Sequence, residues 1–302
     1  MPAESHGDQR LGVVLVAGAA VAWSTAGYFS QLVHVALFPL LVWRNVFGGL
    51  FMLGFLVSTQ RAASIHAFRS LGRVGWFAAC VNGVSMICYL GALRHTSVAN
   101  VVVIYATAPF VAAGLAFLLY RDRASRATLA TGVVALAGVT ITVFGTPGST
   151  GLFGDLLAVA MTFGLAVFTI IARRHRDRSM LAAATASAWV GALIALPFCS
   201  TLRVSPVQLG QLALFGVTSF GLGLILYSIG ARHLHAARSA LISALDTPLA
   251  PLWVWIAFGE RPAVAALIGG ALVMVSVVAN IVGERAPAPS ILELEPLVEP
   301  LV

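Results

Sequence analysis

Long apolar runs alternate with short polar connections along the whole sequence. Each run is close to the roughly 20 residues that an α-helix needs to cross a bilayer. The connections are too short to hold an inserted soluble domain. The pattern therefore predicts ten membrane-spanning helices, at residues 11–33, 38–58, 74–93, 98–120, 127–145, 152–172, 181–201, 209–231, 237–258 and 263–282.

The composition supports a lipid environment. Apolar side chains make up 59% of the chain and charged ones only 10%, against about 25% charged residues in a typical soluble domain. A soluble fold has too little interior to hide so much apolar surface. The composition excludes an ordinary cytosolic enzyme, a disordered chain and a secreted disulfide scaffold.

The distribution of arginine predicts the orientation. All 18 basic residues are Arg, because the chain has no Lys. Most lie in connections on the same side as the N-terminus, whereas the opposite side holds Arg94, Arg203 and Arg261. Basic residues accumulate in cytoplasmic loops. We therefore expect a cytoplasmic tail at 1–10 and a second one at 284–302, which is rich in Pro and Glu and predicted to be disordered.

An internal duplication organises the ten spans. When residues 91–142 are laid on 230–281 without a gap, Gly91 meets Gly230 and Pro109 meets Pro248. Each half, 11–145 and 152–282, holds five spans, so the second enters the membrane upside down. The predicted fold is an all-α membrane protein with ten transmembrane helices in two inverted five-helix repeats. Secondary transporters commonly use this architecture, with a substrate site near the midplane.

Asp246 is the strongest candidate for chemistry, because it lies near the middle of the ninth span. A carboxylate at that depth costs several kcal/mol, roughly, unless it is paired, protonated or hydrated. One interpretation is a substrate-amine contact or a proton-coupling acid. The other is a buried acid that is hydrogen-bonded to a neighbouring helix for structural reasons.

Arg44 is the one basic residue well inside a predicted span. Its guanidinium fork suits a substrate carboxylate, but it can equally snorkel outward or have a structural or gating role. If Arg44 and Asp246 faced one cavity, they would suit a zwitterion such as an amino acid.

Other residues are candidates of lower rank. The prolines in spans four and nine free backbone carbonyls and favour hinges or kinks, and Glu260 suits a gate or a helix cap. Aromatic and amide side chains inside the predicted spans can contact a ligand, or the aromatic ones can lie at the membrane interface. The hinge or gate candidates are Pro109, Pro248, Pro251 and Glu260, and the further substrate-binding candidates are Trp23, Tyr28, Asn82, Tyr89, Tyr105 and Tyr227.

The sequence resembles a known family in several stretches. Residues 230–273, with Leu245 to Pro248, Gly259-Glu260 and a Gly-rich last helix, are similar to the second repeat of EamA-type proteins of the drug/metabolite transporter superfamily. Tyr89 to Leu93, Ala108-Pro109 and the segment from Pro39 to Arg44 match the first repeat. The chain has Tyr120-Arg121 where the family usually carries Gly-Glu, so a glutamate role shared by both halves does not transfer.

The resemblance implies a ten-helix carrier of small solutes, often an exporter of amino acids or related metabolites. It also implies a central cavity lined by helices 1, 3, 4, 6, 8 and 9. We expect a secondary transporter that acts as an exporter, works by alternating access and is coupled to protons if Asp246 titrates. The expected partners are a small-molecule substrate, the lipid bilayer and protons, without nucleic acid, in a bacterial plasma membrane.

Two other classes of function stay open. A structural or signalling membrane protein would show no solute flux and would tolerate Asp246→Asn. A membrane-embedded enzyme would need nucleophile–base or metal clusters, and the sequence contains no GxSxG or HExxH pattern. We therefore expect no enzymatic activity, no metal site and no cofactor, and the absence of a Walker motif disfavours direct ATP drive.

Overall fold

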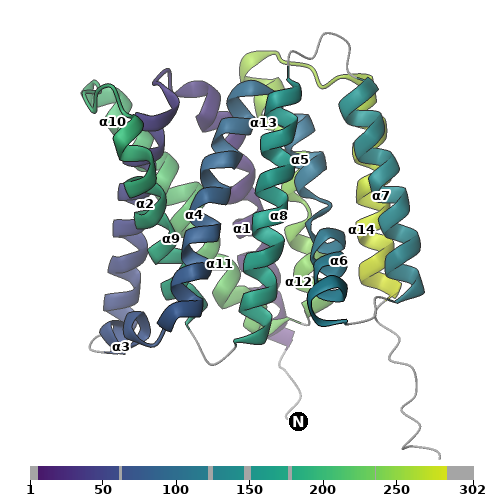
Figure 1. Cartoon of the computed structure of the whole chain (residues 1–302), viewed down its shortest axis with the longest axis horizontal. Coiled ribbons are helices and arrows are strands. Elements are labelled where there is room, and N and C mark those ends of the chain that lie inside the picture. The colour runs from purple at the N-terminus through teal and green to yellow at the C-terminus, as the bar shows by residue number, and fades with distance from the viewer. Residues whose placement is uncertain are drawn as a thin grey trace, which may run out of the picture.

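The chain folds into one bundle of helices that stand side by side (Figure 1). This computed structural model describes residues 6–60, 63–121, 125–145, 151–175, 179–234 and 236–283. Within those ranges every regular element is helical, and ten helical segments are long and apolar enough to cross a membrane. The predicted fold class and the number of spans are confirmed. The predicted tail at 284–302 lies outside the described residues, whereas helix already begins at His6, inside the predicted N-terminal tail.

The first repeat contains five spans, one of which is broken, and one short connecting helix. Its elements are α1 (His6–Leu32), α2 (Leu37–Gln60), the connecting α3 (Ala63–Arg69), α4 (Gly72–His95), the broken span α5 (Val98–Tyr105) with α6 (Ala108–Tyr120), and α7 (Arg126–Gly145).

The second repeat has the same order with more irregular turns. Its elements are α8 (Leu152–Arg174), α9 (Met180–Ala195) with the 3₁₀ turn η1 (Leu196–Phe198), α10 (Pro206–Phe215), the π-helical η2 (Gly216–Leu222), α11 (Gly223–Gly230), the 3₁₀ turn η3 (Ala231–His233), α12 (Ala236–Ser243), α13 (Asp246–Phe258) and α14 (Val264–Gly283).

Side-chain caps begin several helices where the sequence offers a serine. Ser97 and Ser179 accept hydrogen bonds from backbone N–H groups of α5 and α9. Ser205 begins α10 with a capping box to Gln208. Caps of this kind satisfy N–H groups that have no partner within the helix.

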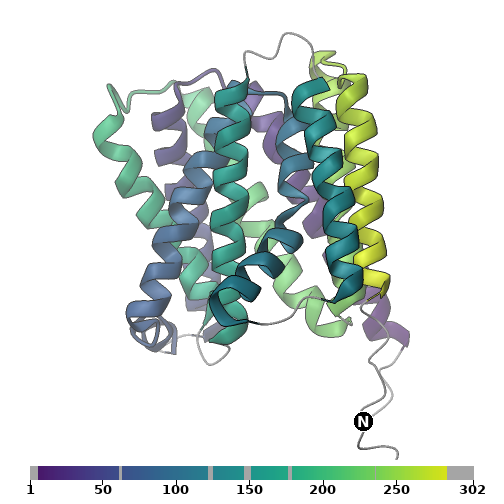
Figure 2. The same ribbon diagram turned by 45° about the vertical axis from the view of Figure 1, so that its right-hand side comes forward.

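Corresponding spans of the two repeats break near the middle. The fourth span is interrupted between Tyr105 and Ala108, and the ninth between Ser243 and Asp246. A proline follows each break, Pro109 and Pro248, and proline lacks the N–H that would continue the helical ladder. α6 therefore runs obliquely to the other helices (Figure 2) and packs on α8.

Glycines allow the closest helix contacts. A Cβ at Gly138 of α7 would lie 2.6 Å from the carbonyl oxygen of Gly269 in α14, so these two backbones touch. Small residues at helix interfaces have this effect in membranes. The α7–α14 pair stands at one edge of the bundle (Figure 1).

Candidate functional site

A cavity of ≈ 710 Å³ lies between the fourth, sixth, ninth and tenth spans. It extends from mid-span residues to the ends of α7, α8 and α14 on the face where α1 begins (Figure 1). Its polar or charged lining consists of Trp23, Tyr105, Thr128, Thr169, Arg174, Ser243, Asp246, Thr247 and Asn280.

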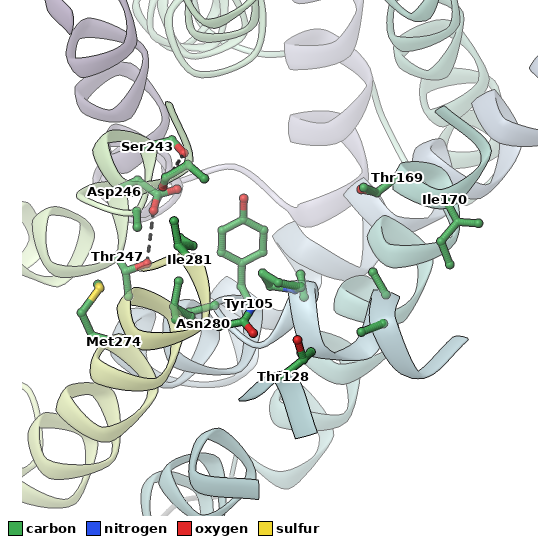
Figure 3. Close-up of a pocket in the computed structure, with 18 of the residues that line it drawn as sticks. Tyr105, Thr128, Thr169, Ile170, Ser243, Asp246, Thr247, Met274, Asn280 and Ile281 are labelled. Atoms are coloured by element: carbon green, nitrogen blue, oxygen red, sulfur yellow. Dashed lines mark hydrogen bonds between the residues drawn. The ribbon is translucent and has the colours of Figure 1, made fainter. Parts of the chain in front are cut away.

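Asp246 is the acid of this cavity and begins α13. The hydroxyl of Thr247 donates a hydrogen bond to its Oδ1 over 3.2 Å, and Figure 3 shows the two residues together on one wall. Because the carboxylate lies in the first turn of α13, the helix dipole favours its charged form. Among the described residues Asp246 forms no ion pair, so its charge faces the cavity without a basic partner.

Aromatic side chains form the deep end. Trp23 lines the cavity and packs against Tyr227 of α11 in a tilted arrangement, with 5.3 Å between ring centroids. Tyr105 projects from the break in the fourth span, between the wall of Asp246 and the wall of Thr169 (Figure 3). This end combines apolar ring faces with hydroxyl and indole groups, which suits a small amphipathic ligand.

Arg174 marks the mouth of the cavity. It is exposed at the end of α8, and its guanidinium lies 3.4 Å from the ring centroid of Tyr120 in α6. This cation–π contact joins the last turn of α6 to the second repeat. It lies at the edge through which a solute would pass.

The opposite end of the bundle is closed by contacts between the repeats. Gln31, at the end of α1, donates its side-chain N–H to Glu260 Oε2 over 2.5 Å. Tyr28 packs on Phe258 nearby, with ring centroids 5.5 Å apart. Deeper in the bundle, the indole N–H of Trp253 donates to the Ser24 hydroxyl over 2.8 Å. The cavity therefore reaches one face only.

Some of the residues predicted from the sequence line this cavity. They are Asp246, Trp23, Tyr105 and Pro109. The remaining candidates lie elsewhere, and their functional roles stay predictions. They are Arg44, Tyr28, Asn82, Tyr89, Tyr227, Pro248, Pro251 and Glu260.

Arg44 is buried away from the cavity, with 2% of its surface exposed. Its Nη1 donates to Asn45 Oδ1 over 3.2 Å, and its guanidinium lies over Phe215 at 4.8 Å from the ring centroid. α2 turns Arg44 toward Phe215 of α10 and Phe220 of η2, and Arg44 is not among the residues that line this cavity. A zwitterion clamp between Arg44 and Asp246 therefore stays a prediction.

Asn82 and Tyr227 do not line the cavity and contact other side chains instead. Asn82 of α4 donates to the Ser187 hydroxyl of α9 over 2.8 Å in a buried contact. Tyr227 lies behind Trp23. Both positions show that polar groups inside spans also serve contacts between helices.

The lining differs from the one that the resemblance implies. Spans five and ten contribute, through Thr128 and Asn280, whereas α4 and α11 do not. α4 packs along α8, and Trp23 stands between α11 and the cavity. Sequence reasoning missed Ser243, Thr247 and the lining threonines, because a lone hydroxyl often bonds back to its own helix, as Thr169 does to Leu165.

A second hollow of ≈ 730 Å³ adjoins the first. It lies between α6, α7 and α8, and its lining is apolar apart from three threonines, Thr107, Thr128 and Thr162. Exposed side chains such as Leu129, Val133 and Phe163 line it, so it opens toward the lipid. The two hollows share Thr128 and Ala113.

The fold and the site define a class: a polytopic helical membrane protein of two five-span repeats with a polar cavity at a broken helix. The EamA-like transporter family profile matches residues 10–144 and 152–282, so the chain belongs to this family.

Two comparisons add to this. The chain is 32% identical over 118 residues to "Uncharacterized transporter YetK" of Bacillus subtilis (strain 168), and this match spans 37% of the chain and 36% of the relative. A protein of known crystal structure, 20% identical, superposes with a TM-score of 0.64 over 91% of this chain and 97% of its own. That likeness shows the fold.

Proposed function

We propose that this protein is a secondary transporter that exports small amine-bearing metabolites, amino acids or related compounds, by alternating access. The observation that carries the proposal is Asp246, a carboxylate without a basic partner among the described residues, in a cavity that reaches one face of the bundle. Ionisable residues at membrane depth mark substrate or proton pathways. Membership of a transporter family and a relative named as a transporter support the same function.

The structure corresponds to one of the two states that alternating access requires. The cavity reaches the face where α1 begins, and the Gln31–Glu260 contact closes the other face. The arginine distribution favours a cytoplasmic open face, so we propose that this is the inward-open state of a bacterial plasma-membrane protein with both termini inside. Loading from the cytosol followed by opening outward gives export.

The breaks in spans four and nine suit the conformational change. The interrupted backbones between α5 and α6 and between α12 and α13 carry fewer intrahelical hydrogen bonds than a continuous helix. Pro109 and Pro248 keep them interrupted. We propose that the two repeats rock about these breaks while Asp246 stays at the centre.

The cavity limits the substrate class by size and charge. Its ≈ 710 Å³ lies within the range of about 300–1,000 Å³ of small-molecule sites. A carboxylate at the start of α13 suits an ammonium group, and the rings of Trp23 and Tyr105 suit an apolar or aromatic remainder. A proton on Asp246 and a substrate ammonium would compete for the same oxygens, which couples export to proton entry.

Flux into proteoliposomes tests the proposal. A panel of amino acids and amines is offered with and without an imposed pH gradient, and amine-bearing solutes should show flux that the gradient drives. Asp246→Asn should reduce that flux by roughly 10–100-fold, the value of a charge-assisted contact, whereas Asp246→Glu should retain part of it. Equal gradient-driven flux in Asp246→Asn and wild type would overturn the assignment of Asp246.

A further inference from the structure

A buried polar cluster joins the two repeats at the face opposite the mouth of the cavity. It consists of Thr96, Asn100 and Asp155. The Thr96 hydroxyl donates to Asp155 Oδ1 over 2.8 Å, and the Asn100 side-chain amide donates to the same oxygen over 3.3 Å. Asn100 Nδ2 also lies 3.4 Å from Thr96 Oγ1. Thr96 lies in the connection between α4 and α5, Asn100 in α5, and Asp155 in α8.

Two acceptor oxygens in this cluster have no hydrogen-bond donor. Asp155 is 3% exposed and Asn100 is 1% exposed. The second carboxylate oxygen, Asp155 Oδ2, and the amide oxygen, Asn100 Oδ1, are both buried and unpartnered. Leaving such acceptors unpaired is unfavourable, and more so for a charged group than for an amide. Two of them in one cluster point to a ligand that accepts electron pairs.

The two basic side chains that directly precede Thr96 in the sequence are directed elsewhere. Arg94 donates from Nη2 to the backbone oxygens of Val33 and Val35, at 2.8 and 3.1 Å. The His95 ring packs edge-on against Phe153, with centroids 5.2 Å apart. Both side chains are exposed, so neither compensates the buried carboxylate.

The surrounding helix ends favour an ionised carboxylate beside a cation. Asp155 lies in the first turn of α8, where the helix dipole stabilises its negative charge. α4 ends at His95 directly before Thr96, and the last carbonyl groups of a helix lack intrahelical donors. Gly154 allows the close approach, because a Cβ there would lie 2.6 Å from the His95 carbonyl carbon.

We propose that Asp155, Asn100 and Thr96 form a binding site for Na⁺. The oxygens of a carboxylate, an amide and a hydroxyl are hard ligands that suit such an ion. One carboxylate supplies one negative charge, which a monovalent cation balances and a divalent one exceeds. This proposal departs from the expectation of no metal site, because that expectation rested on His and Cys spacing. It is independent of the transport function of Asp246.

Equilibrium binding of ²²Na⁺ to the purified full-length chain in detergent tests the site, with choline chloride keeping the ionic strength constant. We expect saturable binding of one ion per chain. Asp155→Asn should abolish it, and Asn100→Ala, which keeps the carboxylate, should weaken it by at least roughly tenfold. Ser30→Ala is the matched control, since Ser30 Oγ is another buried unpartnered oxygen, on α1, and should leave binding unchanged.

Three results would overturn the site. The first is a folded wild-type chain without saturable ²²Na⁺ binding. The second is undiminished binding in Asn100→Ala, which decides the question even where Asp155→Asn does not fold. The third is thermal stability that depends on pH through Asp155 but not on Na⁺, which would assign a proton to these oxygens. None of the measurements needs a transport substrate, so they are separate from the flux assay.

Discussion

Breaking the contact between Gln31 and Glu260 should shift the protein toward its outward-open state. The amide of Gln31 donates to a carboxylate oxygen of Glu260 across the two repeats, over 2.5 Å. In the proposed alternating-access cycle, this hydrogen bond exists only while the face that carries Glu260 is closed, so removing it should raise the free energy of the closed form alone. Glu260→Ala and Gln31→Ala each remove it.

The magnitude follows from the surroundings of the pair. A hydrogen bond to a charged group contributes about 1.5–3 kcal/mol when buried, but Glu260 is exposed and Gln31 half-buried, so we take about 1 kcal/mol. That value changes the ratio of closed to open forms roughly fivefold.

Cysteine labelling measures this shift. The three free cysteines, Cys80, Cys88 and Cys199, are first replaced. A single cysteine at Ser243 in the cavity then reports access by a membrane-impermeant maleimide from either side. Labelling from the outer side should rise roughly fivefold in each single variant and no further in the double variant, because both lose the same bond. Independent, additive effects of the two substitutions would refute the reasoning.

Three further substitutions test packing and backbone. Arg121 caps α6 with a φ of 59°, a conformation that favours glycine, so Arg121→Gly should raise the free energy of unfolding by roughly 0.5–1 kcal/mol in denaturant titration. Gly138→Val should separate α7 from α14 at Gly269. The resulting overpacking should lower the free energy of unfolding by about 1–3 kcal/mol. Asn82→Ala should lower the melting temperature through its lost bond to Ser187 while substrate affinity is unchanged; a weakened affinity at normal stability would instead make Asn82 a ligand contact.

The sequence predicted the number and most limits of the spans, because burial in lipid requires an uninterrupted apolar length. The eighth span begins earlier than expected, at Pro206 rather than 209, because the Ser205–Gln208 capping box starts the helix within polar residues. The seventh ends earlier, as α9 stops at Ala195 and a 3₁₀ turn with Pro197 follows. The π-helical stretch in the eighth span has no signal in the hydrophobic pattern.

The sequence indicates how far along its span a polar residue of the candidate site lies. It does not indicate in which direction around the helix axis the side chain points. A charge in the middle of an apolar run identifies Asp246 from sequence alone. Arg44 satisfies a similar criterion, yet α2 presents it to Phe215 and Asn45. The direction in which a buried polar residue points depends on contacts between helices, such as those allowed by Gly48 against Gly216, and one sequence does not specify these.

The broken spans of the two repeats differ in the polar residue that follows the break. In the gap-free alignment of the repeats, Thr107 corresponds to Asp246, and both lie beside the helix break. Thr107 returns its hydroxyl to the Ile104 carbonyl and lines the apolar hollow that faces lipid, whereas Asp246 lines the polar cavity. A second carboxylate at Thr107 would be desolvated in an apolar groove. The repeats therefore share a helix break but not a charge, so the proposed proton coupling would have one central acid to act through among the described residues.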